Sequence, residues 1–324
     1  MEIKIDNFND LRKSGVKVTV FTVKNIKYFA EFTILLLANF FILLVPLKFS
    51  LWIGRRLGSI AFHMLKIRRD VVLKNLNLAF PNKSYSEIFS IAERSYKNFA
   101  MSMIELLSFP KLRMKDFLKN NIEFEGTECL DNSFMKKEGV VLIAGHFGSW
   151  ELMGAVARNK GYPISFLVGQ QHNIYVDNLL NFYRKLKNIG IIPLKMALKS
   201  VIKALKNGEF VAMLSDQDAG RRDGIFINFF GKLASTPKGP AVFALHTDLP
   251  VVMGFCIRKP EKIRHKIKFV TLDFRKSGNN EKDIEALTLK YTQILEGFIK
   301  KYPDHWFWFH KRWKTTVDNT ENMY

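Results

Sequence analysis

The segment VVLIAGHFGSWELMGAVARNKG, residues 140–161, decides the fold of this chain. It opens with a short apolar run, VVLIA, bounded by Gly139 and Gly145, which is typical of a buried strand. The part that begins at Glu151 is typical of a helix and stops at Gly161, a residue that often ends helices. A strand followed directly by a helix is the repeating unit of an α/β domain.

The same alternation continues through the rest of the chain. Further strands are expected in ISFLVG (164–169), FVAMLSD (210–216), PVVMGFCI (250–257) and KIKFVTLDF (266–274). Helices are expected over residues 178–188 and 199–207, from about Thr236–Pro237, from about Asp283 to Lys301, and on both sides of Pro81. With no linker and no internal repeat, the pattern predicts one α/β domain with a single central sheet flanked by helices.

An apolar stretch precedes this domain. Residues 32–47, FTILLLANFFILLVPL, are near the lower length limit for crossing a bilayer. A cleaved signal peptide is disfavoured, because about 30 residues precede the stretch and no Ala-x-Ala-like site follows it. Tyr28, Trp52 and the Arg55–Arg56 pair resemble flanks at a membrane interface, which favours a membrane anchor over residues 28–54. A buried core helix is the alternative.

Composition narrows the class of partner. The formal charge of +20, from 50 basic and 30 acidic side chains, favours an anionic partner such as acidic lipid headgroups, an acidic carrier protein or nucleic acid. Cys129 and Cys256 show no disulfide or zinc spacing, and His305 and His310 have no partner at ligand spacing, so no metal is expected. The chain contains neither a Walker A nor a GxGxxG motif, so no cofactor is predicted.

His146 follows the strand directly, at the edge where open α/β sheets bind ligands. Glu151 lies five residues further, about 140° away in a regular helix, so the two side chains can meet only across a strand-to-helix turn. A carboxylate on one imidazole nitrogen would leave the other nitrogen to take a proton from a hydroxyl. Taken alone, such a pair is more often a capping histidine and a solvated glutamate than a catalytic pair.

Four segments together resemble the lipid A biosynthesis acyltransferase family of Gram-negative bacteria, within the His-x4-Asp/Glu glycerolipid acyltransferase type. They are HFGSWE (146–151), SDQDAGRRDGIFINFFGKLASTPKGPAVFALHTDLPVV (215–252), RRDVVLKNLNLAFP (68–81) and PDHWFWFHKRW (303–313). The resemblance implies a glycerol-3-phosphate acyltransferase-like mixed sheet. It also divides the chain into an N-terminal segment (1–27), the anchor (28–54), an acyltransferase domain (55–316) and a tail (317–324). Ser149 departs from the asparagine common in the family.

By resemblance, His146 is the general base and Glu151 its partner. The donor is an acyl carrier protein thioester, the acceptor is a hydroxyl of a lipid A precursor, and the enzyme works at the inner membrane with its catalytic domain facing the cytoplasm. Arg184 and Asp216 also fall near site positions of the family. We expect Arg184 or the backbone amides after His146 to stabilise an oxyanion, and Asp216 to orient Arg184 or a substrate hydroxyl.

Charge near the site suggests one more binding residue. Arg221, in the turn GRRDG, could meet the carrier protein or lipid phosphates, although a solvated loop is equally consistent with its position. Two other functions stay open at this point. One is a lysophospholipid or other glycolipid acyltransferase, and the other is a non-catalytic basic membrane or nucleic-acid binding protein, suggested by charge and by the aromatic-basic segment at 303–314. The acyltransferase hypothesis expects no nucleic-acid partner.

Overall fold

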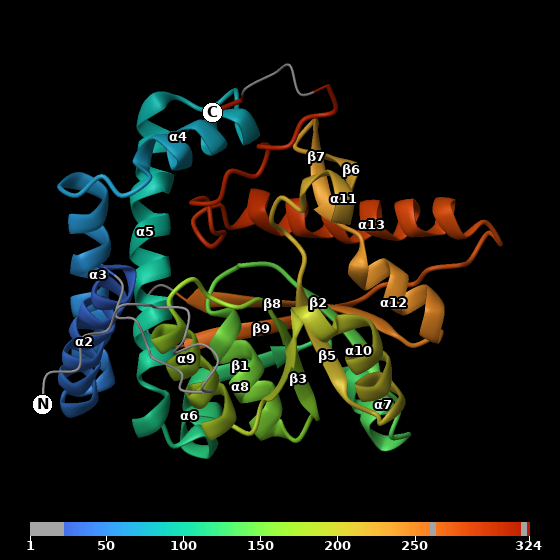
Figure 1. Cartoon of the computed structure of the whole chain (residues 1–324), viewed down its shortest axis with the longest axis horizontal. Helices are drawn as coiled ribbons and strands as arrows, with labels where there is room; N and C mark the ends of the chain where they lie inside the picture. Colours follow the sequence, from blue (N-terminus) through green and yellow to red (C-terminus); the bar gives the residue numbers. More distant parts are fainter. Residues whose placement is uncertain (1–22, 260–263, 319–322) are drawn as a thin grey trace, which may run out of the picture.

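A computed structural model describes residues 23–259, 264–318 and 323–324. Seven strands form one sheet in the order β1-β9-β8-β2-β5-β3-β4, in the lower half of Figure 1. Neighbouring strands are parallel except β8 and β9, which are antiparallel. The strands are β1 (Ile122–Glu125), β2 (Val140–Ala144), β3 (Ile164–Val168), β4 (Gly190–Pro193), β5 (Phe210–Leu214), β8 (Val251–Lys259) and β9 (Arg264–Thr271). The predicted α/β class with one central mixed sheet is confirmed.

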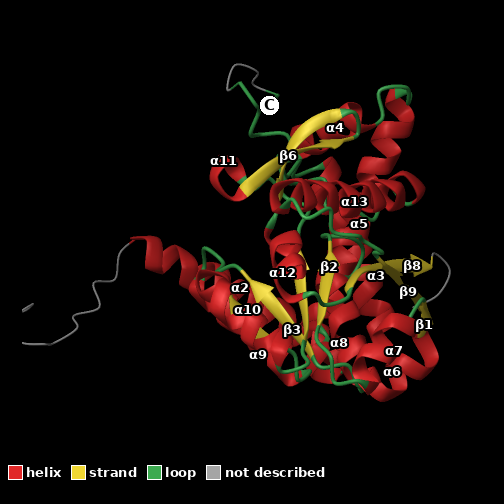
Figure 2. Cartoon of the chain, turned by 90° about the vertical axis from the view of Figure 1, so that its right-hand side faces the viewer, coloured by secondary structure: helices red, strands yellow, loops and turns green. Residues whose placement is uncertain are grey.

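Helices cover both faces of the sheet (Figure 2). Successive side chains of a strand point to opposite faces, so Val141 and Ile143 of β2 pack into one core while Leu142 and Ala144 pack into the other. The first core is covered by α10 (Ala197–Lys206), α12 (Gly239–Thr247) and α13 (Asn280–Lys301). The second is covered by α6 (Met114–Asn121), α7 (Glu128–Met135), α8 (Trp150–Lys160) and α9 (Ile174–Leu186).

Four helices from the first part of the described chain lie at the left of Figure 1. They are α2 (Val23–Leu44), α3 (Leu47–His63), α4 (Arg69–Ala79) and α5 (Tyr85–Leu107). Within α2, the 20 residues Asn25–Leu44 are long and apolar enough to cross a membrane. Pro46 separates α2 from α3, since a proline cannot continue the hydrogen-bond ladder of a helix. The division of the chain at residues 27, 54 and 316 remains a prediction, and its border at residue 54 falls inside α3.

The structure also contains elements that the sequence pattern did not predict. β6 (Gly224–Phe229) and β7 (Lys232–Pro237) form a separate antiparallel hairpin. Its two-residue loop, Phe230 and Gly231, has positive φ at both positions, as tight hairpin turns require. The helix predicted to begin near Thr236–Pro237 was placed wrongly, because these residues end β7 and α12 begins at Gly239. β1 and β4 are too short to carry a clear apolar pattern.

Candidate active site

The turn between β2 and α8 carries His146 and is held on two sides. Phe307 N–H donates to the His146 carbonyl oxygen (2.9 Å), and Gly148 N–H donates to the His305 carbonyl oxygen (2.7 Å). From α5, the Ser102 hydroxyl donates to the Gly148 carbonyl oxygen (3.2 Å). Gly148 has φ +58°, and a Cβ there would lie 1.8 Å from the Cys256 carbonyl oxygen. Only glycine therefore fits this position of the turn.

His146 is paired with Asp216. The His146 Nδ1 lies 2.8 Å from one carboxylate oxygen, and the other oxygen accepts from the His146 backbone N–H (2.8 Å) and from the Trp306 indole (2.7 Å). Asp216 lies two residues beyond the end of β5, the strand beside β2, which brings residues 70 apart in sequence to the same edge of the sheet. The carboxylate is fully buried, whereas 22% of the His146 side chain is exposed.

The charge state of Asp216 follows from these contacts. Burial by itself would raise the pKa of this carboxyl, but the charge and hydrogen bonds of His146 and the Trp306 indole outweigh burial and lower it. Asp216 is therefore a carboxylate at neutral pH, and it accepts the hydrogen bond of the proton on His146 Nδ1. The other ring nitrogen, Nε2, is left as the basic atom, with the Gln217 amide nitrogen 3.5 Å away.

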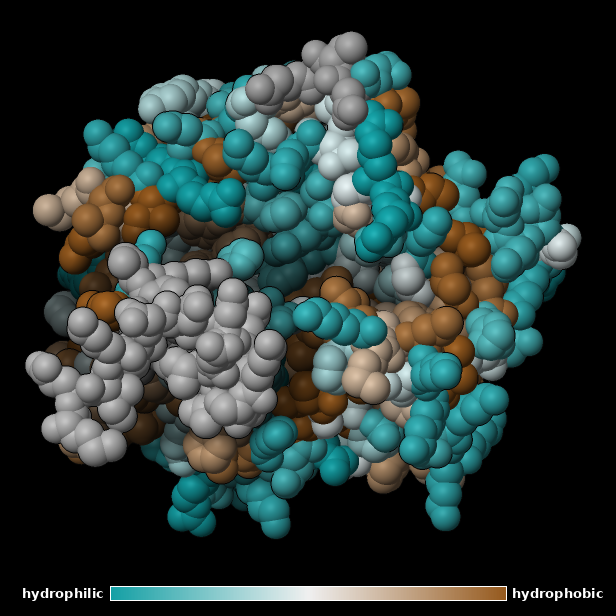
Figure 3. All heavy atoms as spheres, viewed as in Figure 1, coloured by the Kyte–Doolittle hydropathy of each residue, from teal (hydrophilic) through white to brown (hydrophobic). Residues whose placement is uncertain are grey.

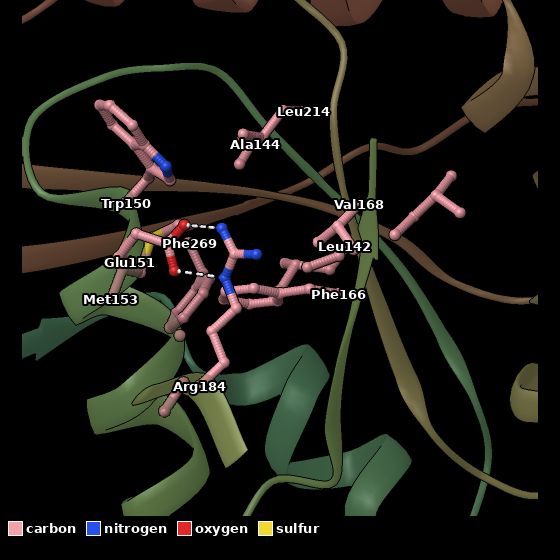
Figure 4. A pocket seen from close by; sticks show the side chains of 14 residues that line it. Leu142, Ala144, Trp150, Glu151, Met153, Phe166, Val168, Arg184, Leu214 and Phe269 are labelled. Atoms are coloured by element: carbon pink, nitrogen blue, oxygen red, sulfur yellow. Dashed lines mark hydrogen bonds and ion pairs between the residues drawn. The ribbon is translucent and has the colours of Figure 1, made fainter. Parts of the chain in front are cut away.

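The predicted hydrogen bond between His146 and Glu151 is wrong. Glu151 instead forms a two-point ion pair with Arg184, with Nη2 to Oε1 at 2.5 Å and Nε to Oε2 at 3.1 Å (Figure 4). Both side chains are about nine-tenths buried. Because α8 begins at Trp150, its first turn directs Glu151 towards α9, where Arg184 lies. The expectation that Asp216 orients Arg184 is also wrong, because Arg184 is paired with Glu151 and Asp216 with His146.

A mostly apolar pocket begins at this ion pair. It has a volume of about 50 Å³ and runs between α8 and the sheet, with Glu151 and Arg184 among its lining residues (Figure 4). Small residues keep it open. A Cβ on Gly154 would meet the ring of Phe166 at 2.1 Å, so a glycine here gives that ring its space. The other lining residues are Leu142, Ala144, Trp150, Met153, Ala157, Leu167, Val168, Ala212, Leu214 and Phe269.

A second, wider groove of about 1150 Å³ adjoins the pocket and shares Leu167, Val168 and Leu214 with it. Three basic side chains, Lys195, Arg222 and Lys238, line this groove together with two acidic ones, Asp177 and Asp223, and Arg222 is paired with Asp223 at 3.2 Å. The face of the molecule drawn in Figure 3 is hollowed near its centre. An apolar pocket that opens beside a larger groove with polar and basic side chains suits a substrate with a hydrocarbon part and a polar part.

Arg221 and the two tail histidines have other contacts. Arg221 Nη2 donates to the carbonyl oxygens of Thr316 and Val317, both at 2.7 Å. His310 Nε2 accepts from the Asp218 backbone N–H (3.0 Å), and burial lowers its pKa to about 4. His305 Nε2 accepts from the Arg258 backbone N–H (3.1 Å). These two histidines thus fasten backbone segments, and the described part of the chain has no cluster of three metal-ligating side chains.

Sequence reasoning missed the residues that hold the turn between β2 and α8, which carries His146. Trp306 and Ser102 reach the site from segments 160 and 44 residues away from His146, a separation at which spacing carries no signal. Asp216 was recognised as a candidate, but its partner was not. The available clue was that SDQD directly follows the predicted strand FVAML, since neighbouring parallel strands bring their carboxyl ends together.

A buried Asp–His pair at the carboxyl edge of a mixed sheet, beside an apolar pocket, suits an enzyme that activates a hydroxyl near a lipid chain. Comparison with known proteins defines the class further. The model of the bacterial lipid A biosynthesis acyltransferases matches residues 22–315, and the chain belongs to this family. It is therefore an acyltransferase of lipid A biosynthesis.

Several curated relatives are similar over most of their length. The lipid A biosynthesis palmitoleoyltransferase of Escherichia coli K12 is 26% identical over 284 residues, which cover 86% of this chain and 90% of the relative. The lauroyltransferase of the same organism is 26% identical over 276 residues, covering 84% and 87%. A lipid A biosynthesis acyltransferase of Haemophilus influenzae is 27% identical over 293 residues, covering 87% and 90%.

Proposed function

We propose that this enzyme transfers an acyl group from an acyl carrier protein thioester to a hydroxyl of a lipid A precursor, with His146 as the general base. This is a secondary acylation of lipopolysaccharide biosynthesis. The observation that carries the proposal is the His146–Asp216 pair, which leaves Nε2 as the basic nitrogen of a partly exposed ring. That ring lies 5.0 Å, centroid to centroid, from Trp150, a residue that lines the apolar pocket.

The chemical steps follow from this geometry. His146 Nε2 removes the proton from the acceptor hydroxyl while its oxygen attacks the thioester carbonyl carbon. Asp216 stabilises the imidazolium that forms, because its carboxylate holds Nδ1 throughout. When the tetrahedral intermediate collapses, the carbon–sulfur bond breaks and the carrier thiolate takes the proton from His146. The acyl group never becomes attached to the enzyme.

Backbone amides after His146 remain candidate donors to the oxyanion. The N–H groups of Phe147 and Gly148 already donate to the carbonyl oxygens of Gly145 and His305, so the candidates lie further along the turn. Two groups remain nearby. The first N–H groups of α8 have no partner within the helix, and the Ser149 hydroxyl at its start is buried without a hydrogen bond. Together with Arg184 they are the proposed donors.

The pocket between α8 and the sheet is proposed to bind the acyl chain. Its walls are apolar beyond the Glu151–Arg184 pair, so burial of a hydrocarbon chain there is favourable. The ion pair at the pocket then marks the polar end of the chain, where the thioester lies. The basic side chains of the adjoining groove, Arg222 among them, suit the phosphates of a lipid A precursor.

The carrier protein and the location are proposed on separate grounds. The net charge of +20 suits an acidic carrier protein and the acidic lipids of a membrane surface. Arg221, which is exposed and fastens residues 316–317, remains a proposed contact for such a partner. The apolar helix α2 supports attachment to the inner membrane, with the catalytic domain on the cytoplasmic side, where acyl carrier protein occurs.

The test is mass spectrometry of a lipid A precursor incubated with the enzyme and acyl carrier protein thioesters of several chain lengths. We expect the precursor to gain the mass of one acyl chain. His146→Ala should lower the rate by about 10² to 10⁴-fold, the usual contribution of a general base, while the thermal unfolding transition stays intact. The same thioesters on coenzyme A test the choice of donor. An unchanged precursor mass with every donor would overturn the proposal.

A further inference from the structure

We infer that neither α2 nor α3 crosses the bilayer, and that both lie against one leaflet with their apolar faces among its acyl chains. The inference rests on the membrane attachment proposed above and adds how the attachment is made. Both helices lie at the same edge of the molecule, the left-hand edge in Figure 1. The exposed apolar side chains of the two helices contact the hydrocarbon of a single leaflet.

The surface is formed by large apolar side chains that no other part of the described chain covers. They come from both helices and from the loop after α3, and most are about half or more exposed. These residues are Ile26, Phe29, Ile34, Leu37, Phe40, Phe41 and Leu44 of α2, Trp52, Leu57 and Ile60 of α3, and Met64, Leu65 and Ile67 of the loop. So large an apolar surface on one side of a protein marks a contact with a membrane or a partner.

Polar contacts fasten α2 to the catalytic domain near its start. The Asn173 side-chain amide, at the beginning of α9, donates to the Tyr28 carbonyl oxygen (2.9 Å) and to Glu31 (3.1 Å). The ring of Phe32 stacks on Tyr175, with centroids 5.6 Å apart. This end of α2 therefore lies on the catalytic domain and does not point away from it.

The same holds for the middle and the end of α2. Asn39 is buried, donates to the Leu107 carbonyl oxygen (2.9 Å) and accepts from the Tyr183 hydroxyl. Lys111 donates to the carbonyl oxygen of Val45 (2.6 Å), just beyond the helix. From Tyr28 to Val45, at about 1.5 Å per residue, these contacts span about 25 Å, which is most of the hydrocarbon thickness of a bilayer.

A spanning α2 would therefore have one of two costs. If it kept these contacts, it would draw Lys111 and the polar start of α9 into the hydrocarbon, at about 2.5–3.5 kcal/mol for a lysine. If it separated from the domain, Asn39 would lose both partners in a medium that offers no replacement, at about 1–3 kcal/mol for each group left unpaired. A helix that lies in the plane of one leaflet keeps every contact.

α3 is fixed even more closely to the domain. A Cβ on Gly54 would lie 2.8 Å from Ile104, and one on Gly58 would lie 2.7 Å from the Lys97 Cα, so the two glycines let α3 approach the backbone of α5. The outer face of α3 carries Trp52, with the Arg56 guanidinium 5.3 Å above its ring. An indole beside an arginine is a combination favoured where hydrocarbon meets headgroups.

The experiment compares which side of the membrane each end of α2 faces. Lys27→Cys places a thiol on an exposed residue at the start of α2, and Lys136→Cys places one on an exposed turn of the catalytic domain. Each variant is treated with a membrane-impermeant maleimide in inner-membrane vesicles of both orientations, with the unsubstituted chain measuring background from Cys129. We expect both thiols to be labelled in the same vesicle preparation.

The outcomes separate this inference from the proposed function. Labelling of the two thiols in opposite preparations, or no labelling of Lys27→Cys in either, would overturn the single-leaflet arrangement alone. A chain that stays soluble as a dimer and leaves the membranes unbound would overturn the membrane attachment itself, with a second copy as the occupant. In a supporting measurement, Phe32→Cys and Tyr175→Cys should cross-link in membranes through a short reagent, whereas Phe40→Cys and Tyr175→Cys should not.

Discussion

Asp216 and Glu151 are both buried carboxylates near His146, yet they have different partners. Asp216 accepts hydrogen bonds from His146 and Trp306, whereas Glu151 accepts them from two nitrogens of the Arg184 guanidinium. A carboxylate that holds Nδ1 fixes the tautomer of the base, and one that holds an arginine fixes a positive charge. The carboxylate that orients the His146 ring is therefore Asp216.

Asp216→Asn should slow acyl transfer by about 10²-fold or more, because an amide does not stabilise the imidazolium and can favour the wrong tautomer. The measurement is kcat at saturating acceptor and donor. Asp218→Asn is the matched control, since Asp218 lies two residues away and binds Thr315 instead of His146, so its kcat should stay within a few-fold of the original enzyme. A folded Asp216→Asn variant with normal kcat would contradict the assignment of His146's partner.

A second buried cluster, on α5 and the antiparallel strands, has a structural role. The Glu105 carboxylate accepts hydrogen bonds from Arg258 Nη1 (2.7 Å) and Nη2 (2.8 Å), and His265 Nε2 lies 2.8 Å from one of its oxygens. Burial would lower the pKa of His265, but the negative charge of Glu105 outweighs burial and raises it to about 9. His265 is thus charged at neutral pH and fastens α5 to β9.

This raised pKa predicts that stability depends on pH. The contribution of His265 is fully present below about pH 6.5, the ordinary histidine pKa, and is lost as pH rises through about 9. At its full size it is on the order of 3 kcal/mol. The free energy of unfolding, measured in urea from pH 6 to pH 10, should fall across that interval. In His265→Gln this part of the fall should be absent, and an unchanged pH profile in that variant would rule out the effect.

At the scale of elements, the distance between α3 and α5 is set by glycine. Gly58→Ala should destabilise the protein, although alanine is the better helix former by about 1 kcal/mol, because the added methyl meets the α5 backbone. Gly297→Ala is the matched control, since it also lies within a helix but has nothing within 4 Å of the added Cβ, and it should be neutral or stabilising. Thermal unfolding distinguishes the two, and equal shifts would contradict the close packing of α3.

The pocket between α8 and the sheet predicts donor preference. Ala212→Leu, on β5, should shift the enzyme towards shorter acyl chains, because the larger side chain occupies volume within the pocket. Competition between carrier-protein thioesters of different length, read by product mass, measures the shift. Met213→Leu is the control, as the next residue of β5 points to the other core, and its product distribution should be unchanged. An unaltered distribution in Ala212→Leu would show that the chain binds elsewhere.

At the scale of the whole molecule, charge and apolar surface act together on membrane binding. The net charge of +20 should strengthen binding to vesicles that contain anionic lipid, and salt from about 0.1 to 1 M should weaken it as the Debye length falls from about 10 to 3 Å. Flotation with neutral vesicles is the control, where only the apolar surface acts and salt should have little effect. Equal salt dependence on both vesicle types would contradict a role for the charge.

How much could be predicted from the sequence depended on the range of the interactions. The long apolar strands β2, β5 and β8 and the helices α8 and α13 were predicted, because each leaves a periodic pattern within its own residues. The partner of His146 was predicted wrongly, since spacing along the chain favoured Glu151 while the order of strands in the sheet selects Asp216. The β6–β7 hairpin left no clear signal, because its turn begins with a phenylalanine at positive φ.

The segment after α13 packs on the turn that carries His146, and this contact has a consequence for the synthesis of the chain on the ribosome. His305, Trp306 and Phe307 all contact the turn or Asp216, so the His146 geometry cannot be complete until about 160 further residues have been made. At a ribosomal rate of about 5–20 residues per second, this takes roughly 10–30 s. α2 and α3 leave the ribosome well before then. With the proposed attachment through α2 and α3, a chain still being synthesised can bind the membrane before the His146 site is complete, and the proposed catalysis begins only after synthesis of the whole site.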